Sequence, residues 1–150
     1  KFENGTIFKS VSGMRSTLSP TVDLRKKANN QLTTPVVVQE FVPGEDVRCH
    51  VVGKHCIATL ATGSQNVDYR EKNSGVSYLP TQASSSLKTR MLNYTDSKRM
   101  LLSGFDFKLG QNGNWDCLEM NPAPTFATYE LATGQEISTA IIETAINMLE

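Results

Sequence analysis

Two pairs of strand-like segments, each reversed by a short turn, place the strongest constraint on how this 150-residue chain can fold. The segments DVRCHVV and HCIATLATG flank Gly53-Lys54, and SGFDFKLG and NWDCLEMN flank Asn112-Gly113. Short runs of β-branched and aromatic residues around a two-residue turn of this kind predict β-hairpins. Neighbouring strands joined in this way run antiparallel, so we expect an antiparallel sheet.

Other segments add strands and helices around the two hairpins. Strands are expected at Thr6–Ser10 and, from the run PVVVQEFV, at residues 35–42, and a polar loop at residues 64–78. Helices are expected over three ranges: 21–32, 87–102 and 136–149. The last range carries apolar residues at helical spacing, which predicts a buried stripe: Ile137, Ala140, Ile141, Thr144, Ala145 and Met148. Strands and helices in separate blocks predict the α+β class.

Composition excludes several kinds of partner. Fifteen basic and fifteen acidic residues cancel, so the chain has no overall field that would attract nucleic acid or an anionic membrane. Cys49, Cys56 and Cys117 form no CxxC pair, and the two histidines do not complete a zinc pattern with them. Reduced thiols, together with the absence of a signal peptide or long apolar run, predict a cytoplasmic protein.

The expected hairpin around Asn112-Gly113 brings two acids together. A two-residue turn there sets Asp106 opposite Glu119 and Phe105 opposite Met120. Because side chains alternate between the faces of a strand, each face of the hairpin takes its own set. The apolar set is Phe105, Phe107, Leu109, Leu118 and Met120, and the polar set is Asp106, Lys108, Cys117, Glu119 and Asn121.

Directly opposed carboxylates repel each other and destabilise a strand pair. We therefore expect a positive group between Asp106 and Glu119. Two carboxylates and the carboxamide of Asn121 are oxygen ligands that suit Mg²⁺ or Mn²⁺. The alternative is a solvated polar face on which Lys108 neutralises one of the acids.

Three segments, taken in order, resemble the ATP-grasp ligases: VVVQEFVPGEDVRCHVVG, VDYR, and GFDF followed by NWDCLEMNPAPTFATYELATG. They look most like the branch of ribosomal-protein glutamate ligases and graspetide (microviridin-type) peptide ligases. The resemblance runs from about Ile7 to the C-terminus. It implies an ATP-grasp fold, with a partial lid in about residues 1–38, a metal- and nucleotide-binding subdomain in residues 39–150, and an upstream domain missing from this sequence.

The resemblance implies a metal site and a nucleotide site. In the family, an acid on one strand and an E-x-N on the next hold two magnesium ions against the phosphates of ATP, and Asp106, Glu119 and Asn121 match these positions. The acid that contacts ribose matches Asp46, with Glu45 as the alternative. The hinge whose backbone binds adenine matches four consecutive residues: Gln39, Glu40, Phe41 and Val42.

The resemblance also implies cations for the phosphates. Lys9 is similar to the family lysine that reaches the phosphates from a lid strand. Arg70, in VDYR, matches a basic residue that faces the transferred phosphoryl group or the substrate carboxylate, and Arg48 is expected to do similar work. A flexible ammonium and a planar guanidinium suit these tasks. His50 and His55 lie on hairpin strands and are poor candidates for a general base.

The activity implied is ATP-dependent ligation through an acyl phosphate. A carboxylate substrate would be joined to an amine, or to a hydroxyl in the ester-forming branch, and the acceptor could belong to a peptide, a protein or an amino acid. Lys9 and Arg70 would stabilise charge on the migrating phosphoryl group. The alternative is a non-catalytic module that binds a nucleotide or a peptide and has kept only the fold.

Overall fold

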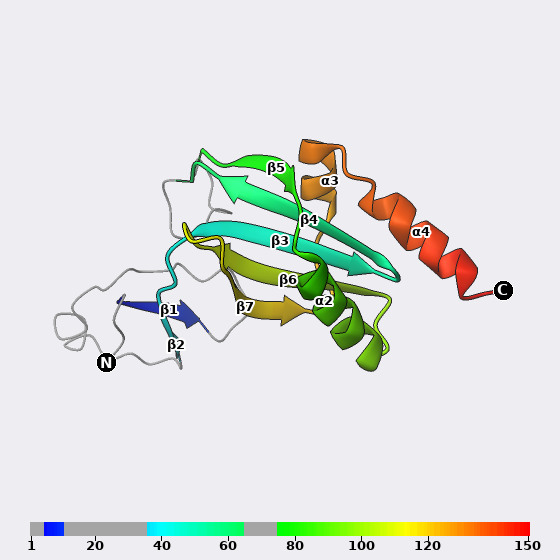
Figure 1. Ribbon diagram of the computed structural model, residues 1–150, viewed down its shortest axis with the longest axis horizontal. Coiled ribbons are helices and arrows are strands. Elements are labelled where there is room, and N and C mark those ends of the chain that lie inside the picture. Colours follow the sequence, from blue (N-terminus) through cyan, green and yellow to red (C-terminus); the bar gives the residue numbers. More distant parts are fainter. Residues whose placement is uncertain (1–4, 11–35, 65–74) are drawn as a thin grey trace.

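The computed structural model of the chain describes residues 5–10, 36–64 and 75–150 (Figure 1). A small sheet pairs β1 (Thr6–Ser10) with β2 (Val36–Glu40). A larger antiparallel sheet has the strand order β5-β4-β3-β6-β7. Its strands are β3 (Glu45–Val52), β4 (His55–Thr62), β5 (Ser77–Thr81), β6 (Leu102–Leu109) and β7 (Trp115–Asn121). The helices of the described residues are α2 (Ser85–Ser97), α3 (Ala127–Thr133) and α4 (Ile137–Asn147).

The two faces of the larger sheet differ in what covers them. On one face, alternate residues of β3 and β6, such as Val47 and Phe105, pack with Met91 of α2 in the main hydrophobic core. On the other face, Tyr129 of α3 contacts the rings and cations of the sheet. In Figure 1, α4 extends past one end of the larger sheet, and β1 and β2 lie at the other. Within the described residues, no helix is long and apolar enough to cross a membrane.

The predicted β3–β4 hairpin is confirmed. Its register pairs Val52 with His55, which leaves Gly53-Lys54 as the two-residue turn. Gly53 has a φ of +53°, a left-handed conformation that glycine adopts without steric cost. The strands predicted at residues 6–10 and 35–42 are also present, as β1 and β2. The helix predicted over residues 21–32 lies outside the described residues.

Helix α2 is shorter than the predicted range of 87–102. It begins earlier, because the Ser84 side chain accepts a hydrogen bond from the backbone N–H of Leu87 at 3.3 Å and so caps the helix. It ends at Ser97, and Arg99 follows with a φ of +53°. Leu102 already belongs to β6, so the predicted C-terminal end of the helix was wrong.

Two elements were missed in the sequence. Strand β5 begins within the predicted loop and contains Pro80, which cannot donate a ladder hydrogen bond. The strand tolerates proline because it is the edge strand of its sheet. Helix α3 is only seven residues long, and Gly134, which follows it, has a φ of +69°.

The last helix is close to its predicted position, but its apolar stripe is only partly buried. Ile137 and Ala140 in its first turns are buried. Ile141, Thr144 and Ala145 are half-buried, and Met148, beyond the C-terminal end of the helix, is 72% exposed. The predicted stripe is therefore fully buried at the N-terminal end of the helix, half-buried further along, and exposed at Met148.

The β6–β7 hairpin has the expected pairing at the acids but a different turn. Asp106 lies opposite Glu119, which confirms the predicted register at this point. The two-residue turn was wrong, because Gly110 donates its N–H to the carbonyl of Asn114 at 2.9 Å and the reversing loop has one more residue. A bulge at Leu118, between the Asp106 and Phe107 pairings, restores the register.

The bulge changes which residues of β7 share the apolar face. Phe107 lies opposite Cys117, so the predicted places of Cys117 and Leu118 were wrong. Trp115 lies opposite Leu109 and packs edge-on against Phe107, with 5.5 Å between the ring centroids. Trp115 thus supports the core of the hairpin.

Candidate functional site

A row of charged side chains crosses the face of the sheet that α3 covers. Asp46 and Arg48 of β3 lie directly opposite Lys108 and Asp106 of β6. Asp106 in turn lies opposite Glu119 of β7. Because opposite residues in a ladder share one face, three neighbouring strands contribute to one polar surface.

Arg48 supplies the positive group expected beside Asp106. Its Nε donates to Oδ1 of Asp106 at 2.6 Å, and its Nη2 donates to Oδ2 at 2.9 Å. The side chains of Arg48 and Asp106 are only 5% and 16% exposed. A two-pronged pair in this setting is the strong form of ion pair, because both hydrogen bonds are charge-assisted and the geometry is fixed. Asp106 can therefore lie opposite Glu119 without a bound cation.

The alternative interpretation, in which Lys108 neutralises one of the two opposed acids, was wrong. Its Nζ lies 2.8 Å from Oδ2 of Asp46 and also donates to the carbonyl of Gly44 at 3.3 Å. Asp46, matched to the ribose contact, is thus half-buried in an ion pair. Glu45, the alternative for that contact, is exposed and accepts a hydrogen bond from Thr62.

The three residues matched to the metal site come from two neighbouring strands. Glu119 is exposed and Asn121 half-buried, and Oδ1 of Asn121 accepts a hydrogen bond from the N–H of Ala123 at 2.8 Å. No group of three His, Cys, Asp or Glu side chains gathers as a metal site in the described ranges. The set nevertheless fits a hard divalent cation, because it offers two carboxylates and a carboxamide oxygen beside one another.

The segment matched to the adenine hinge follows the small sheet. Gln39 and Glu40 end β2, and the N–H of Phe41 donates to the carbonyl of Gly5 at 3.1 Å. All four residues matched to the hinge are half-buried: Gln39, Glu40, Phe41 and Val42. The backbone of Lys9 pairs with Val37, but its side chain lies outside what the structure describes, as does all of Arg70.

An aromatic cluster beneath Arg48 was missed in the sequence. Tyr129 is 5% exposed, and its ring centroid lies 5.6 Å from Cζ of Arg48. The rings of His50 and Tyr78 meet Tyr129 edge-on, with centroid distances of 5.1 Å and 5.4 Å. The alternation Asp46, Arg48, His50 along β3 was the available signal, because it places all three polar residues on one face.

His50 is fully buried and holds the chain that leads from β7 to α3. Its Nε2 lies 3.1 Å from the carbonyl of Thr125. Burial lowers the pKa of His50 to about 4, with a smaller opposing effect from the Thr125 carbonyl. The ring is therefore neutral at pH 7, so Nε2–H is the donor and Thr125 the acceptor.

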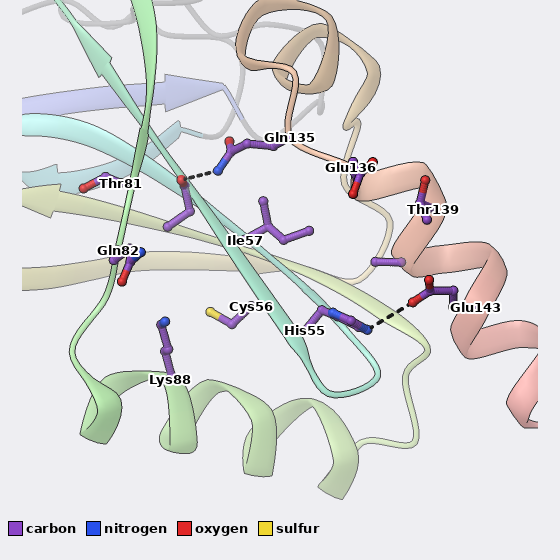
Figure 2. Close-up of a pocket in the computed structure, with 12 residues that line it drawn as sticks. His55, Cys56, Ile57, Thr81, Gln82, Lys88, Gln135, Glu136, Thr139 and Glu143 are labelled. Atoms are coloured by element: carbon purple, nitrogen blue, oxygen red, sulfur yellow. Dashed lines mark hydrogen bonds and ion pairs between the residues drawn. The ribbon is translucent and has the colours of Figure 1, made fainter.

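A polar cavity of about 450 Å³ lies apart from this row of charges, where β5 leaves the edge of β4 (Figure 2). Its walls include His55 of β4, Lys88 of α2 and Glu143 of α4, and His55 and Glu143 approach to 3.6 Å. Gln135, between α3 and α4, lines this cavity (Figure 2), and its Nε2 donates to the carbonyl of Ala58 at 3.0 Å. Of the predicted nucleotide and metal residues that the structure describes, none lines this cavity.

Comparison with known protein families gives a match over nearly the whole chain. Residues 2–145 match the family described as RimK-like ATP-grasp domain. A protein of Pasteurella multocida (strain Pm70) named "Probable alpha-L-glutamate ligase" is 27% identical over 150 residues, which cover 93% of this chain and 48% of that protein. A protein of the same name from Vibrio parahaemolyticus serotype O3:K6 (strain RIMD 2210633) is 28% identical over 116 residues, covering 75% of this chain and 38% of that protein. The chain thus spans half or less of the length of these relatives.

Solved structures show the same fold. The ATP-grasp ligase PsnB complexed with minimal precursor superposes with a TM-score of 0.78 at 21% identity, covering 97% of this chain and 48% of that one. The macrocyclase MdnC bound with precursor peptide MdnA, from Microcystis aeruginosa MRC, gives a TM-score of 0.77 at 22% identity, with coverages of 96% and 48%. These likenesses confirm the predicted α+β ATP-grasp fold. Together with the match over residues 2–145, they lead to one conclusion: the chain belongs to the RimK-like ATP-grasp family.

Proposed function

We propose that this chain is the nucleotide- and metal-binding part of an ATP-dependent ligase that joins a carboxylate to an amine or a hydroxyl through an acyl phosphate. The observation that carries the proposal is the pairing of Asp106 with Glu119 on the polar face of the sheet, in a chain of the RimK-like ATP-grasp family. Arg48 accounts for the charge of Asp106, but neither this ion pair nor the packing of the sheet calls for the exposed Glu119 opposite it. The position of Glu119 therefore favours a role in binding cations.

Asp106, Glu119 and Asn121 would hold two magnesium or manganese ions. These ions would supply positive charge for the phosphates of ATP, which is the main need of phosphoryl transfer. One structural relative, PsnB, has been solved complexed with a phosphomimetic variant of its minimal precursor, Mg and ADP. Asn121 would bind a cation through Oδ1, which already accepts a hydrogen bond from the N–H of Ala123. The oxygen has two lone pairs, so it can do both.

The nucleotide would lie between the hinge and the row of charges. The backbone of Gln39–Val42 would hydrogen-bond adenine, and Asp46 would bind ribose while it keeps Lys108 beside it. Lys9 would reach the phosphates from β1. Arg70 would face the transferred phosphoryl group or the substrate carboxylate.

The reaction would proceed in two steps. The substrate carboxylate attacks the γ-phosphorus of ATP, which forms an acyl phosphate and releases ADP. The acceptor then attacks the acyl carbon, and the bond to phosphate breaks. The acceptor class is a peptide, a protein or an amino acid, in keeping with relatives named for glutamate ligation or solved with precursor peptides.

The test measures phosphate release by the full-length natural protein with Mg-ATP, glutamate and a panel of peptides. We expect release that depends on both the carboxylate and the acceptor, and a loss of at least 100-fold in Glu119→Gln. Asp116→Asn is the matched control, because Asp116 is an exposed acid of the same strand. Equal activity in Glu119→Gln and Asp116→Asn would overturn the metal assignment.

The non-catalytic module predicts a different result. The protein would bind Mg-ATP or a peptide, detected by calorimetry, but would release no phosphate with any carboxylate.

We also propose a cytoplasmic location, which is in keeping with Cys49, Cys56 and Cys117 all being free thiols.

A further inference from the structure

We propose that Arg48 is a positioning residue that orients the carboxylate of Asp106 as a metal ligand, and that Tyr129 of α3 holds Arg48 in place for this task. The inference rests on the proposed function and assigns to Arg48 a role other than direct contact with phosphate. It makes α3 part of the metal-binding machinery, although none of its residues was expected there.

Arg48 is placed to act on Asp106. The residue is only 4% exposed, and Nε and Nη2 are both directed to the two oxygens of Asp106. Each carboxylate oxygen has two lone pairs, and this contact uses one on each oxygen. Two parallel hydrogen bonds also fix the plane of the carboxylate, as partners of metal ligands commonly do.

The guanidinium of Arg48 lies over the ring of Tyr129, which restrains it. The Tyr129 ring lies 5.6 Å from Cζ of Arg48, which is within the range of a cation–π contact. The ring cannot move easily, because His50 and Tyr78 meet it edge-on at 5.1 Å and 5.4 Å. Arg48 is therefore held between Asp106 and a fixed aromatic ring.

Helix α3, which carries Tyr129, is fixed to the sheet at both of its ends. Before the helix, the carbonyl of Thr125 is bound by the ring of the fully buried His50 at 3.1 Å. After the helix, Oε1 of Gln135 accepts from the hydroxyl of Thr59 at 2.6 Å. Thr59 lies directly opposite Arg48 in the β3–β4 ladder, so one attachment is to the strand that carries Arg48 and the other is to its neighbour β4.

Gly104 of β6 allows the chain after β7 to approach Arg48 closely. A Cβ atom at Gly104 would lie 2.6 Å from Cβ of Pro124 and 3.1 Å from Nη1 of Arg48. Real Cβ atoms do not approach carbon atoms to 2.6 Å, so the packing of Pro124 on the sheet depends on glycine here. The close fit around Arg48 thus involves β6, the chain after β7, and α3.

The experiment measures Mn²⁺ affinity in the full-length natural protein by electron paramagnetic resonance of free Mn²⁺, with ADP present. Tyr129→Leu removes the aromatic ring, and we expect it to weaken Mn²⁺ binding by at least fivefold. Tyr129→Phe keeps the ring and should rescue binding to within twofold of the parent. An unchanged Mn²⁺ affinity in Tyr129→Leu would overturn the proposal.

A matched control separates positioning from a general loss of stability. Tyr94 of α2 meets Phe105 edge-on at 6.0 Å on the opposite face of the sheet. Tyr94→Leu should lower the melting temperature but leave Mn²⁺ affinity within twofold. If Tyr94→Leu weakens Mn²⁺ binding as much as Tyr129→Leu does, the effect is one of stability and the proposal fails.

A second readout needs neither metal nor nucleotide. The Nε–H resonance of Arg48, hydrogen-bonded to Asp106, should be protected from exchange in the parent and in Tyr129→Phe, and should lose that protection in Tyr129→Leu. If the parent releases no phosphate under any condition, the proposed function fails, but this resonance still decides whether Tyr129 holds Arg48. Unchanged protection in Tyr129→Leu would contradict the inference alone.

Discussion

The ion pair between Arg48 and Asp106 makes the stability of the protein depend on a residue that the proposed function assigns to metal binding. In Asp106→Asn, the carboxamide offers one oxygen to the guanidinium and turns its NH₂ group toward the other N–H. One of the two hydrogen bonds, at 2.6 Å and 2.9 Å, is therefore lost. The charge of Arg48, whose side chain is 5% exposed, is left without its counter-ion.

The expected cost follows from this geometry. Removing one partner of a buried ion pair costs about 3 to 5 kcal/mol. Because Asp106 is 16% exposed and asparagine keeps one acceptor, we expect the lower end, about 3 kcal/mol. For a chain of this size, that corresponds to a fall of roughly 6 to 12 °C in melting temperature.

Urea unfolding monitored by circular dichroism measures this cost. Asp116→Asn, at an exposed position of β7, is the control and should stay within about 0.5 kcal/mol of the parent. The double variant Arg48→Met, Asp106→Leu should be more stable than Asp106→Asn, because it removes both charges together. A loss below about 0.5 kcal/mol in Asp106→Asn would refute the idea that the pair is buried and mutually dependent.

Three further changes probe other parts of the same architecture. The pKa of His50 is lowered from 6.5 to about 4 by burial, so the unfolded state binds its proton first as the pH falls. Stability should therefore drop by roughly 2 kcal/mol between pH 7 and pH 5 in urea unfolding, and His50→Phe should reduce this dependence. Gly104→Ala, which sets a Cβ 2.6 Å from Pro124, should cost about 1 to 3 kcal/mol, read as a lowered melting temperature. Ser84→Ala removes the cap on the N–H of Leu87 and should cost about 1 kcal/mol by the same measurement.

The sequence was most informative where contacts are local. The β3–β4 hairpin and its Gly53-Lys54 turn were predicted because the strands are neighbours in the chain and the turn requires a left-handed residue. Helix α3 was missed because seven residues carry too little periodicity to distinguish a helix from a loop. Strand β5 was missed because Pro80 argues against a strand unless it is known to lie at an edge.

The partners of the charged residues could not be read from the sequence, because they depend on pairing between distant strands. Arg48 and Asp106 are separated by 58 positions, and nothing local to either residue says that β3 lies beside β6. The pairing of Asp106 with Glu119 was predicted correctly, although the turn on which it was based was not. The longer loop shifts the pairing of β6 with β7 by one residue, and the bulge shifts it back by one residue.

The bulge at Leu118 therefore compensates for the length of the hairpin loop. The extra residue in the loop shifts the register of β7, and the extra residue at the bulge corrects it before the strand reaches Glu119. Insertions or deletions of one residue at the tip can thus be absorbed without moving either acid, provided that the bulge opens or closes in step. In related chains, we expect the length of this loop and the presence of the bulge to vary together, while the two acids remain opposite each other.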